Sequence, residues 1–118
     1  MDFDKILNRW ISLVSVQDID GVVSLYNENA VLLGTYSSEI RKGHKNIKLY
    51  FEKFLSKKPK AKIVKFTTDV LSKTSCVVNG FYDFEIEGGE IVCARFSFVF
   101  KKYKSSMQII SHHSSILP

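Results

Sequence analysis

One arginine stands in an otherwise apolar pattern and is the clearest candidate for binding chemistry in this sequence. Arg95 lies in an alternating run, and counting outward from a two-residue loop at Gly88-Gly89 places Tyr82 directly opposite it. A guanidinium beside a phenol in an apolar pocket suits a carboxylate or an enolate-like oxygen. The alternative is a structural arginine, satisfied by a buried carboxylate or by backbone carbonyls.

A second candidate is the run of two histidines and two serines at positions 112–115. Adjacent strand residues point to opposite faces, so only one histidine can enter the pocket of Arg95. An odd-length loop around Lys104 places His113 opposite Arg95, whereas an even-length loop places His112 or Ser114 there. If the protein is an enzyme, His113 is the predicted base, because an imidazole side chain ordinarily exchanges its proton near neutral pH. The alternative is a histidine at a strand end with no chemical role.

The elements that must position these residues follow from the hydrophobic periodicity. Apolar residues at helical spacing predict helices at 3–16, 18–26 and 45–56, and alternating residues predict strands at 30–33, 61–71, 107–116 and on both sides of Gly88-Gly89. This order predicts an α+β fold with helices packed on one face of a strongly curved, mainly antiparallel sheet. Such a sheet forms a cone with a cavity. We expect Tyr82 and Arg95 to point into it, near Trp10.

The same register places the other large aromatic residues of the hairpin on the side away from the helices. Four rings share this side: Phe81, Phe96, Phe98 and Phe100. So much exposed apolar surface is unusual for a monomer, and the pattern therefore predicts a homodimer formed sheet to sheet. The alternative is partial cover by the C-terminal tail.

Composition argues against several other classes of protein. The 118 residues, 45% hydrophobic and 25% charged, fit one domain over residues 1–118. No apolar run reaches the roughly 20 residues of a membrane helix, and no zinc-type ligand spacing is visible, so we expect no membrane, metal or cofactor. The net charge of +5 raises the question of nucleic acid, but the lysines around Pro59 lack interleaved aromatic rings for base stacking. Cys76 and Cys93 are not opposed in apolar strands, which predicts reduced core residues of a cytoplasmic protein.

The order of these motifs resembles the nuclear transport factor 2-like superfamily, also called SnoaL-like or cystatin-like cones. The resemblance extends over nearly the whole chain and is carried by Trp10, Asp20, Val23-Ser24-Leu25-Tyr26, Ala30-Val31-Leu32-Leu33, Gly43, Ile47, Tyr50 and Phe51. The segments 94–100 and 109–115 are similar to the branch with the calcium/calmodulin-dependent protein kinase II association domain and its small bacterial relatives. In that branch a strand arginine lies in the cavity, and a His-X-Ser pattern ends the last strand. Arg95 matches the arginine, and His113 with Ser115 matches the pattern.

The resemblance implies a cone domain that forms homodimers and binds a small, anionic or polar-tipped ligand. The implied ligand-binding residues are Arg95, Tyr82, Trp10, His113 and Ser115. The alternative is a small lyase or isomerase with His113 as its base, acting on an apolar substrate with one polar end; a third reading is an assembly module with a vestigial pocket. Enzymes of this fold that transfer protons usually have a carboxylate in the cavity. Here Asp83, Glu85 and Glu87 fall on the face opposite Arg95, which disfavours the enzyme.

Overall fold

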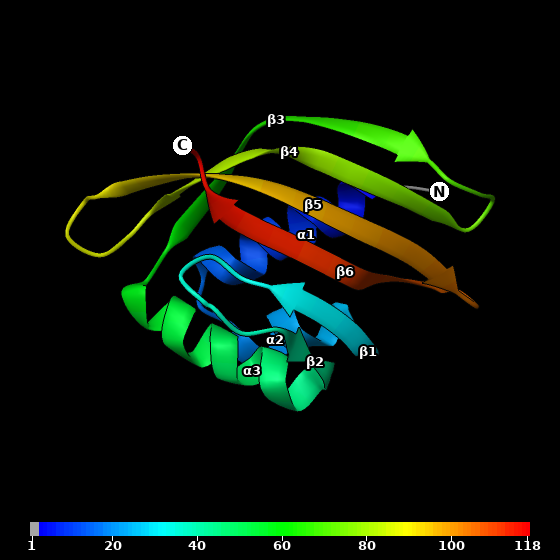
Figure 1. The fold of residues 1–118 in the computed structure, drawn as a ribbon, viewed down its shortest axis with the longest axis horizontal. Coiled ribbons are helices and arrows are strands. Elements are labelled where there is room, and N and C mark those ends of the chain that lie inside the picture. The colour runs from blue at the N-terminus through cyan, green and yellow to red at the C-terminus, as the bar shows by residue number, and fades with distance from the viewer. Residues whose placement is uncertain (1–2) are drawn as a thin grey trace.

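The computed structural model describes residues 3–118, which form a layer of helices against a curved sheet (Figure 1). The helices are α1 (Phe3–Ser15), α2 (Ile19–Ser24) and α3 (Gly43–Phe54), and a 3-10 turn, η1 (Leu55–Lys57), follows α3. The strands are β1 (Tyr26–Leu33), β2 (Arg41–Lys42), β3 (Lys60–Val70), β4 (Ser75–Glu85), β5 (Ile91–Tyr103) and β6 (Ser106–Ile116). The predicted α+β fold is confirmed.

The packing of α1, the start of α2 and the end of α3 each follow from the sequence. The apolar stripe of α1 is buried and consists of Phe3, Ile6, Leu7, Trp10 and Val14. Asp18 caps α2, since its side chain accepts a hydrogen bond of 2.9 Å from the backbone N–H of Gly21. Helix α3 and η1 end just before Pro59, because proline cannot continue a helix. Tyr26, predicted at the end of the second helix, instead begins β1.

The sheet gives the molecule two different faces. Its strands lie in the order β2-β1-β6-β5-β4-β3, and neighbouring strands are antiparallel except β1 and β6. Helices α1 and α3 pack on one side, which we call the inner face (Figure 1). On the other side, the outer face, no helix or strand of residues 3–118 covers the sheet. Because side chains alternate along a strand, the register decides which residues enter the core.

The loop between β4 and β5 is one residue longer than predicted. The backbone N–H of Ile86 donates to the carbonyl of Glu90 at 2.9 Å, so the loop holds three residues, 87–89, rather than two. Gly88 and Gly89 both have positive φ, at 98° and 92°, a conformation that glycine adopts without steric penalty. A Gly-Gly pair therefore accepts either loop length, and it did not by itself fix the register.

The longer loop turns every β5 side chain to the face opposite the predicted one. Tyr82 pairs with Ala94, and Arg95 pairs with Phe81. The expectation that Tyr82 and Arg95 share a face is therefore wrong: Tyr82 is buried on the inner face, and Arg95 is exposed on the outer face. From Val92 to Phe100 the resulting inner face of β5 is apolar, which explains why this register is preferred over one that buries an arginine.

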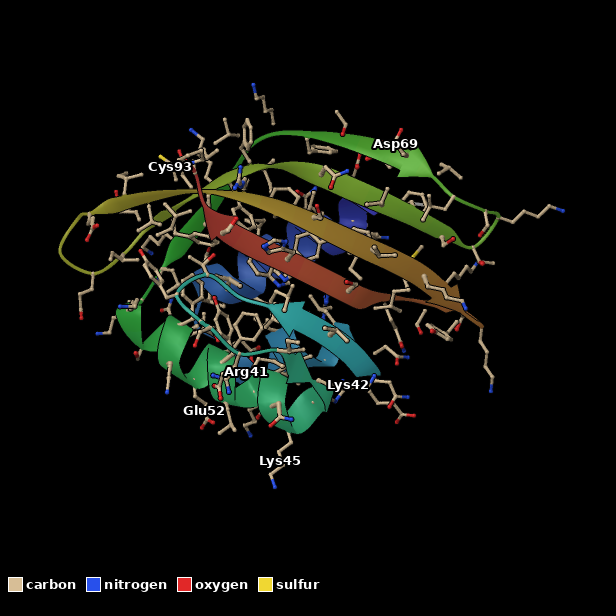
Figure 2. The ribbon with its side chains drawn as sticks, viewed as in Figure 1. Arg41, Lys42, Lys45, Glu52, Asp69 and Cys93 are labelled. Atoms are coloured by element: carbon tan, nitrogen blue, oxygen red, sulfur yellow. The ribbon has the colours of Figure 1, made fainter. Side chains whose placement is uncertain are left out.

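The predicted aromatic dimer face is wrong for the same reason. Phe96, Phe98 and Phe100 are 4%, 0% and 0% exposed, because they lie in the core beneath the helices. Phe81 alone of the predicted four lies on the outer face. Both cysteines are free, but Cys93, which was expected in the core, is exposed and projects away from the helices (Figure 2).

The connection between β5 and β6 decides which histidine faces the core. Its turn has two residues, but a register shift within the strands reverses the parity that such a turn implies. Ser115 therefore pairs with Arg95, and His113 lies at the next position along the same face. His113 thus shares a face with Arg95, as the family pattern suggested, but that face is the outer one. His112 enters the core and is 2% exposed.

Candidate functional site

Three of the predicted ligand-binding residues lie together on the outer face. Arg95, His113 and Ser115 line a shallow depression of about 340 Å³ that extends over β4, β5 and β6. The Nε–H of Arg95 donates a hydrogen bond to Oγ of Ser115 at 3.2 Å. The remaining walls of this depression come from Asn79, Gly80, Phe81, Phe96 and Ser97. Because Arg95 is exposed, the depression offers a hydrated cation at a surface rather than the buried clamp that the sequence predicts.

The other two predicted residues, Trp10 and Tyr82, lie inside the molecule. Their rings stack with centroids 5.6 Å apart and planes inclined by 10°. Since Tyr82 and Arg95 project from opposite sides of the sheet, the predicted pocket that contains both is not formed. His113, the predicted base, is likewise on the outer face, so it is not in contact with the interior of the cone.

A buried chain of hydrogen bonds crosses the core from α1 to β6. Nε1–H of Trp10 donates to the Tyr26 hydroxyl at 3.1 Å, and that hydroxyl lies 2.7 Å from Nδ1 of His112. On the other edge of the imidazole, Nε2 lies 3.2 Å from the Tyr82 hydroxyl. The Tyr82 hydroxyl donates its proton to Ser114. It therefore accepts from Nε2–H of His112, and Nδ1 accepts from Tyr26.

The three titratable groups of this hydrogen-bond network, Tyr26, Tyr82 and His112, are held in their neutral forms. Burial lowers the pKa of His112 to about 3, with a smaller contribution from neighbouring His113. Burial also raises the pKa of the Tyr26 and Tyr82 hydroxyls. At neutral pH the imidazole of His112 is therefore uncharged, and each of its two nitrogens already has a hydrogen-bond partner. This arrangement positions its neighbours; it is not that of a base poised to take up a proton.

The centre of the core has no room for a substrate. The cavity beside Trp10, Tyr82 and His112 measures about 10 Å³, close to the least volume that holds one water molecule. Rings fill the surrounding space, and Trp10 makes edge-to-face contacts with Phe51 and Phe84. The hydrogen-bond chain is therefore part of a packed core.

A larger depression lies between the loop at 34–41 and the C-terminal half of α3. We call it the loop pocket; its volume is about 430 Å³. Its chemically distinctive lining residues are Tyr36, Glu39, Arg41, Tyr50, Lys53 and Lys57. The Arg41 side chain is only 12% exposed. Figure 2 shows it beside α3, on the helical side of the sheet and far from Cys93.

Arg41 could not be identified from the sequence, because the residues around it do not alternate between apolar and polar. Arg95 attracted notice as a charge inside an apolar strand, whereas Arg41 follows a polar loop and belongs to a strand of two residues. One signal was available: an arginine directly after the apolar Ile40 and two residues before Gly43, the first residue of α3.

Residues 3–118 were compared with the geometry of metal sites and of membrane-spanning helices. No group of three His, Cys, Asp or Glu side chains in that range is placed to hold a metal ion. No helix in the same range is both long enough and apolar enough to cross a membrane.

Comparison with known proteins identifies relatives at two levels of similarity. Residues 1–118 match the family model described as calcium/calmodulin dependent protein kinase II association domain. A solved structure from Xanthomonas campestris, whose name carries the same domain, is 36% identical to this chain and has a TM-score of 0.93. The match covers 99% of this chain and 86% of that one. No curated protein matches the sequence.

More distant structures share the fold alone. An NTF-2 like protein of unknown function from Shewanella oneidensis is 19% identical with a TM-score of 0.82, and the match covers 97% of this chain and 96% of that one. A ketosteroid isomerase-like protein from Erwinia carotovora atroseptica is 13% identical with a TM-score of 0.79, covering 98% and 93%. Proteins of this fold carry several functions, so these two likenesses do not assign one.

Proposed function

Because the chain belongs to the calcium/calmodulin dependent protein kinase II association domain family, we propose that it is a self-association domain whose outer sheet face binds a second copy of the chain. The homodimer expected from the sequence is retained, but the contact surface is the outer face and not the buried rings of β5. The observation that carries the proposal is this face itself, which no helix or strand of residues 3–118 covers.

The outer face carries apolar side chains that remain partly exposed. Val77 and Val99 are directly paired across β4 and β5, and Phe81 lies on the same face further along β4. At its sides Leu33 is 39% exposed and Ile91 is 54% exposed. Apolar surface that extends over several strands marks an interaction site in soluble proteins. Packing this face against a second copy would remove these side chains from water.

The charges of this face suit a contact between identical copies. Lys60 and Lys62 on β3 pair with Glu85 and Asp83 on β4, so both signs lie side by side. In a two-fold contact the same patch meets itself, and a surface that carries both signs can match its own copy.

The predicted binding residues keep a role in this proposal, but a different one. Arg95, His113 and Ser115 line the depression within the outer face, where we expect them to receive polar groups of the partner copy. Trp10 and Tyr82 support the core on which the sheet rests. A lyase or isomerase needs a substrate cavity beside its base, and the core cavity of about 10 Å³ supplies none.

A matched pair of variants tests the proposal. Val99→Lys places a charge at the centre of the outer face, and Leu49→Lys places the same charge on the exposed side of α3, where Leu49 is 47% exposed. Sedimentation should show an oligomer for the unmodified chain and for Leu49→Lys, and a 13.5 kDa monomer for Val99→Lys. An unmodified chain that still sediments as a monomer at a protein concentration of about 100 μM would contradict the proposal, because a stable interface should have formed at that concentration. Equal assembly of both variants would contradict it as well.

A further inference from the structure

We propose that the loop pocket binds a small molecule carrying a carboxylate, and that Arg41 is the residue that holds it. This site is separate from the outer face, because it lies on the helical side of the sheet between the loop at 34–41 and α3. A volume of about 430 Å³ lies within the range of small-molecule sites.

The guanidinium of Arg41 is only half used by the protein. Its Nη2 bonds to the Glu39 carboxylate at 2.8 Å. Its Nε is buried and has no hydrogen-bond acceptor among residues 3–118. Leaving a buried donor of a charged group unpaired is costly, because the group has lost its hydrogen bonds to water and gained none in exchange. Since Nε and Nη2 form one edge of the guanidinium, two oxygens of a single carboxylate can satisfy both nitrogens at once.

Glu39 is well placed to act as the internal occupant that such a ligand displaces. Its side chain is 66% exposed, so it can rotate into water at little cost, whereas the Arg41 side chain is only 12% exposed. The Glu39 backbone is held by a 3.2 Å hydrogen bond to the hydroxyl of Ser37, so displacement requires movement of the side chain and not of the loop. The ligand therefore competes only with the Glu39 carboxylate, which contacts a single nitrogen of Arg41.

The charge of the loop pocket favours an anion. Three basic residues, Arg41, Lys53 and Lys57, line it together with one acidic residue, Glu39. Neither lysine forms an ion pair within the part of the chain that the structure describes. The ammonium of Lys57 instead lies 5.4 Å from the centre of the Tyr36 ring.

The walls of the loop pocket favour a ligand with a flat apolar body. The rings of Tyr50 and Phe54 stack with centroids 5.8 Å apart and planes inclined by 20°, and both rings line the pocket. The Tyr50 hydroxyl donates to the backbone carbonyl of Thr35 at 2.9 Å, so its proton is not free for a ligand. The hydrogen bonds to the anion must therefore be donated by Arg41, with additional positive charge from Lys53 and Lys57. Together these features specify a small aromatic or otherwise planar carboxylate.

The test uses benzoate as the probe and benzamide as its uncharged counterpart. Each is titrated into the full chain while the Nε–H resonance of Arg41 is followed by nuclear magnetic resonance. We expect saturable binding of benzoate with a displaced Arg41 Nε–H signal, and no such response to benzamide. Glu39→Gln removes the competing carboxylate from an exposed position and should tighten benzoate binding by about three- to tenfold.

Arg41→Lys should weaken benzoate binding by about tenfold or more, because an ammonium cannot present two nitrogens along one edge. Arg9→Lys on the exposed side of α1 is the matched control and should leave the affinity unchanged. Equal responses to benzoate and benzamide would overturn the proposal. So would a Glu39→Gln variant that binds benzoate no better than the unmodified chain, and this result does not depend on whether Arg41→Lys folds. Tighter binding of inorganic phosphate than of benzoate to Arg41 would overturn the assignment to a carboxylate.

Discussion

The hydroxyl of Tyr26 lies 2.7 Å from Nδ1 of His112, although the two residues are 86 positions apart in the sequence. This contact joins β1 to β6, the one parallel pair of strands within residues 3–118. It also fixes the imidazole as an acceptor at Nδ1, with Nε2–H directed at Tyr82. The interior of the cone is therefore organised around a neutral histidine that is bonded at both nitrogens.

The stability of the fold should decrease as the pH falls below about 6.5, because His112 must be neutral when buried. Its pKa is about 3 in the folded chain and near 6.5 when unfolded, so between these values the unfolded chain binds the extra proton. At about 1.4 kcal/mol per pH unit, His112 should account for a loss of roughly 2 kcal/mol between pH 6.5 and pH 5. Denaturant unfolding at several pH values measures the slope.

His113→Gln is the control for this slope, since His113 is the exposed neighbour on the opposite face. That variant should retain the pH dependence. His112→Gln should be less stable at pH 7 but lose most of the slope between pH 6.5 and 5. An unchanged slope in His112→Gln would show that another group is responsible.

Tyr82→Phe should destabilise the chain by about 1–3 kcal/mol, because it leaves two buried polar groups without their partner. The hydroxyl that it removes bonds to both His112 and Ser114. Tyr36→Phe removes the same atom from a residue that is 56% exposed and should change stability by less than about 0.5 kcal/mol. Thermal unfolding of both variants decides the matter, and equal losses would argue against a satisfied network in the core.

Much of the fold could be predicted from the sequence, because its signals are local. The stripes of α1 and α3 and the alternation of the long strands gave the correct order of elements and the correct class. The register could not be read from the same signals, since Gly88 and Gly89 permit loops of two or three residues. What settles it is a global comparison: one register buries Phe96 and Phe98, and the other buries Arg95.

The candidate sites were harder to predict because they depend on that one-residue choice and on a loop. His113 and Ser115 were correctly grouped with Arg95, since the group moves together when the register changes. Arg41 gains its significance from Glu39 and from α3, which lie beside it only after the loop at 34–41 has folded. No period in the sequence encodes that arrangement.

The corrected register makes its own prediction about stability. Phe98→Ala should cost about 3–5 kcal/mol, since it removes a fully buried ring from the core. Arg95→Ala should cost less than about 1 kcal/mol, because its hydrogen bond to Ser115 is exposed. Chemical denaturation compares the two. A larger loss in Arg95→Ala than in Phe98→Ala would contradict the structural assignment of the faces.

Thiol reactivity at a single position tests most directly whether the outer face is the association surface. In a Cys93→Ser background, Ser97→Cys places a thiol at the centre of that face, and Leu49→Cys places one on α3; Cys76 is buried in both. We predict that the rate of modification of Ser97→Cys falls as the protein concentration is raised through the range in which the chain assembles, while the rate for Leu49→Cys stays constant. Rates for Ser97→Cys that do not change with concentration, in a sample that sedimentation shows to be oligomeric, would contradict it.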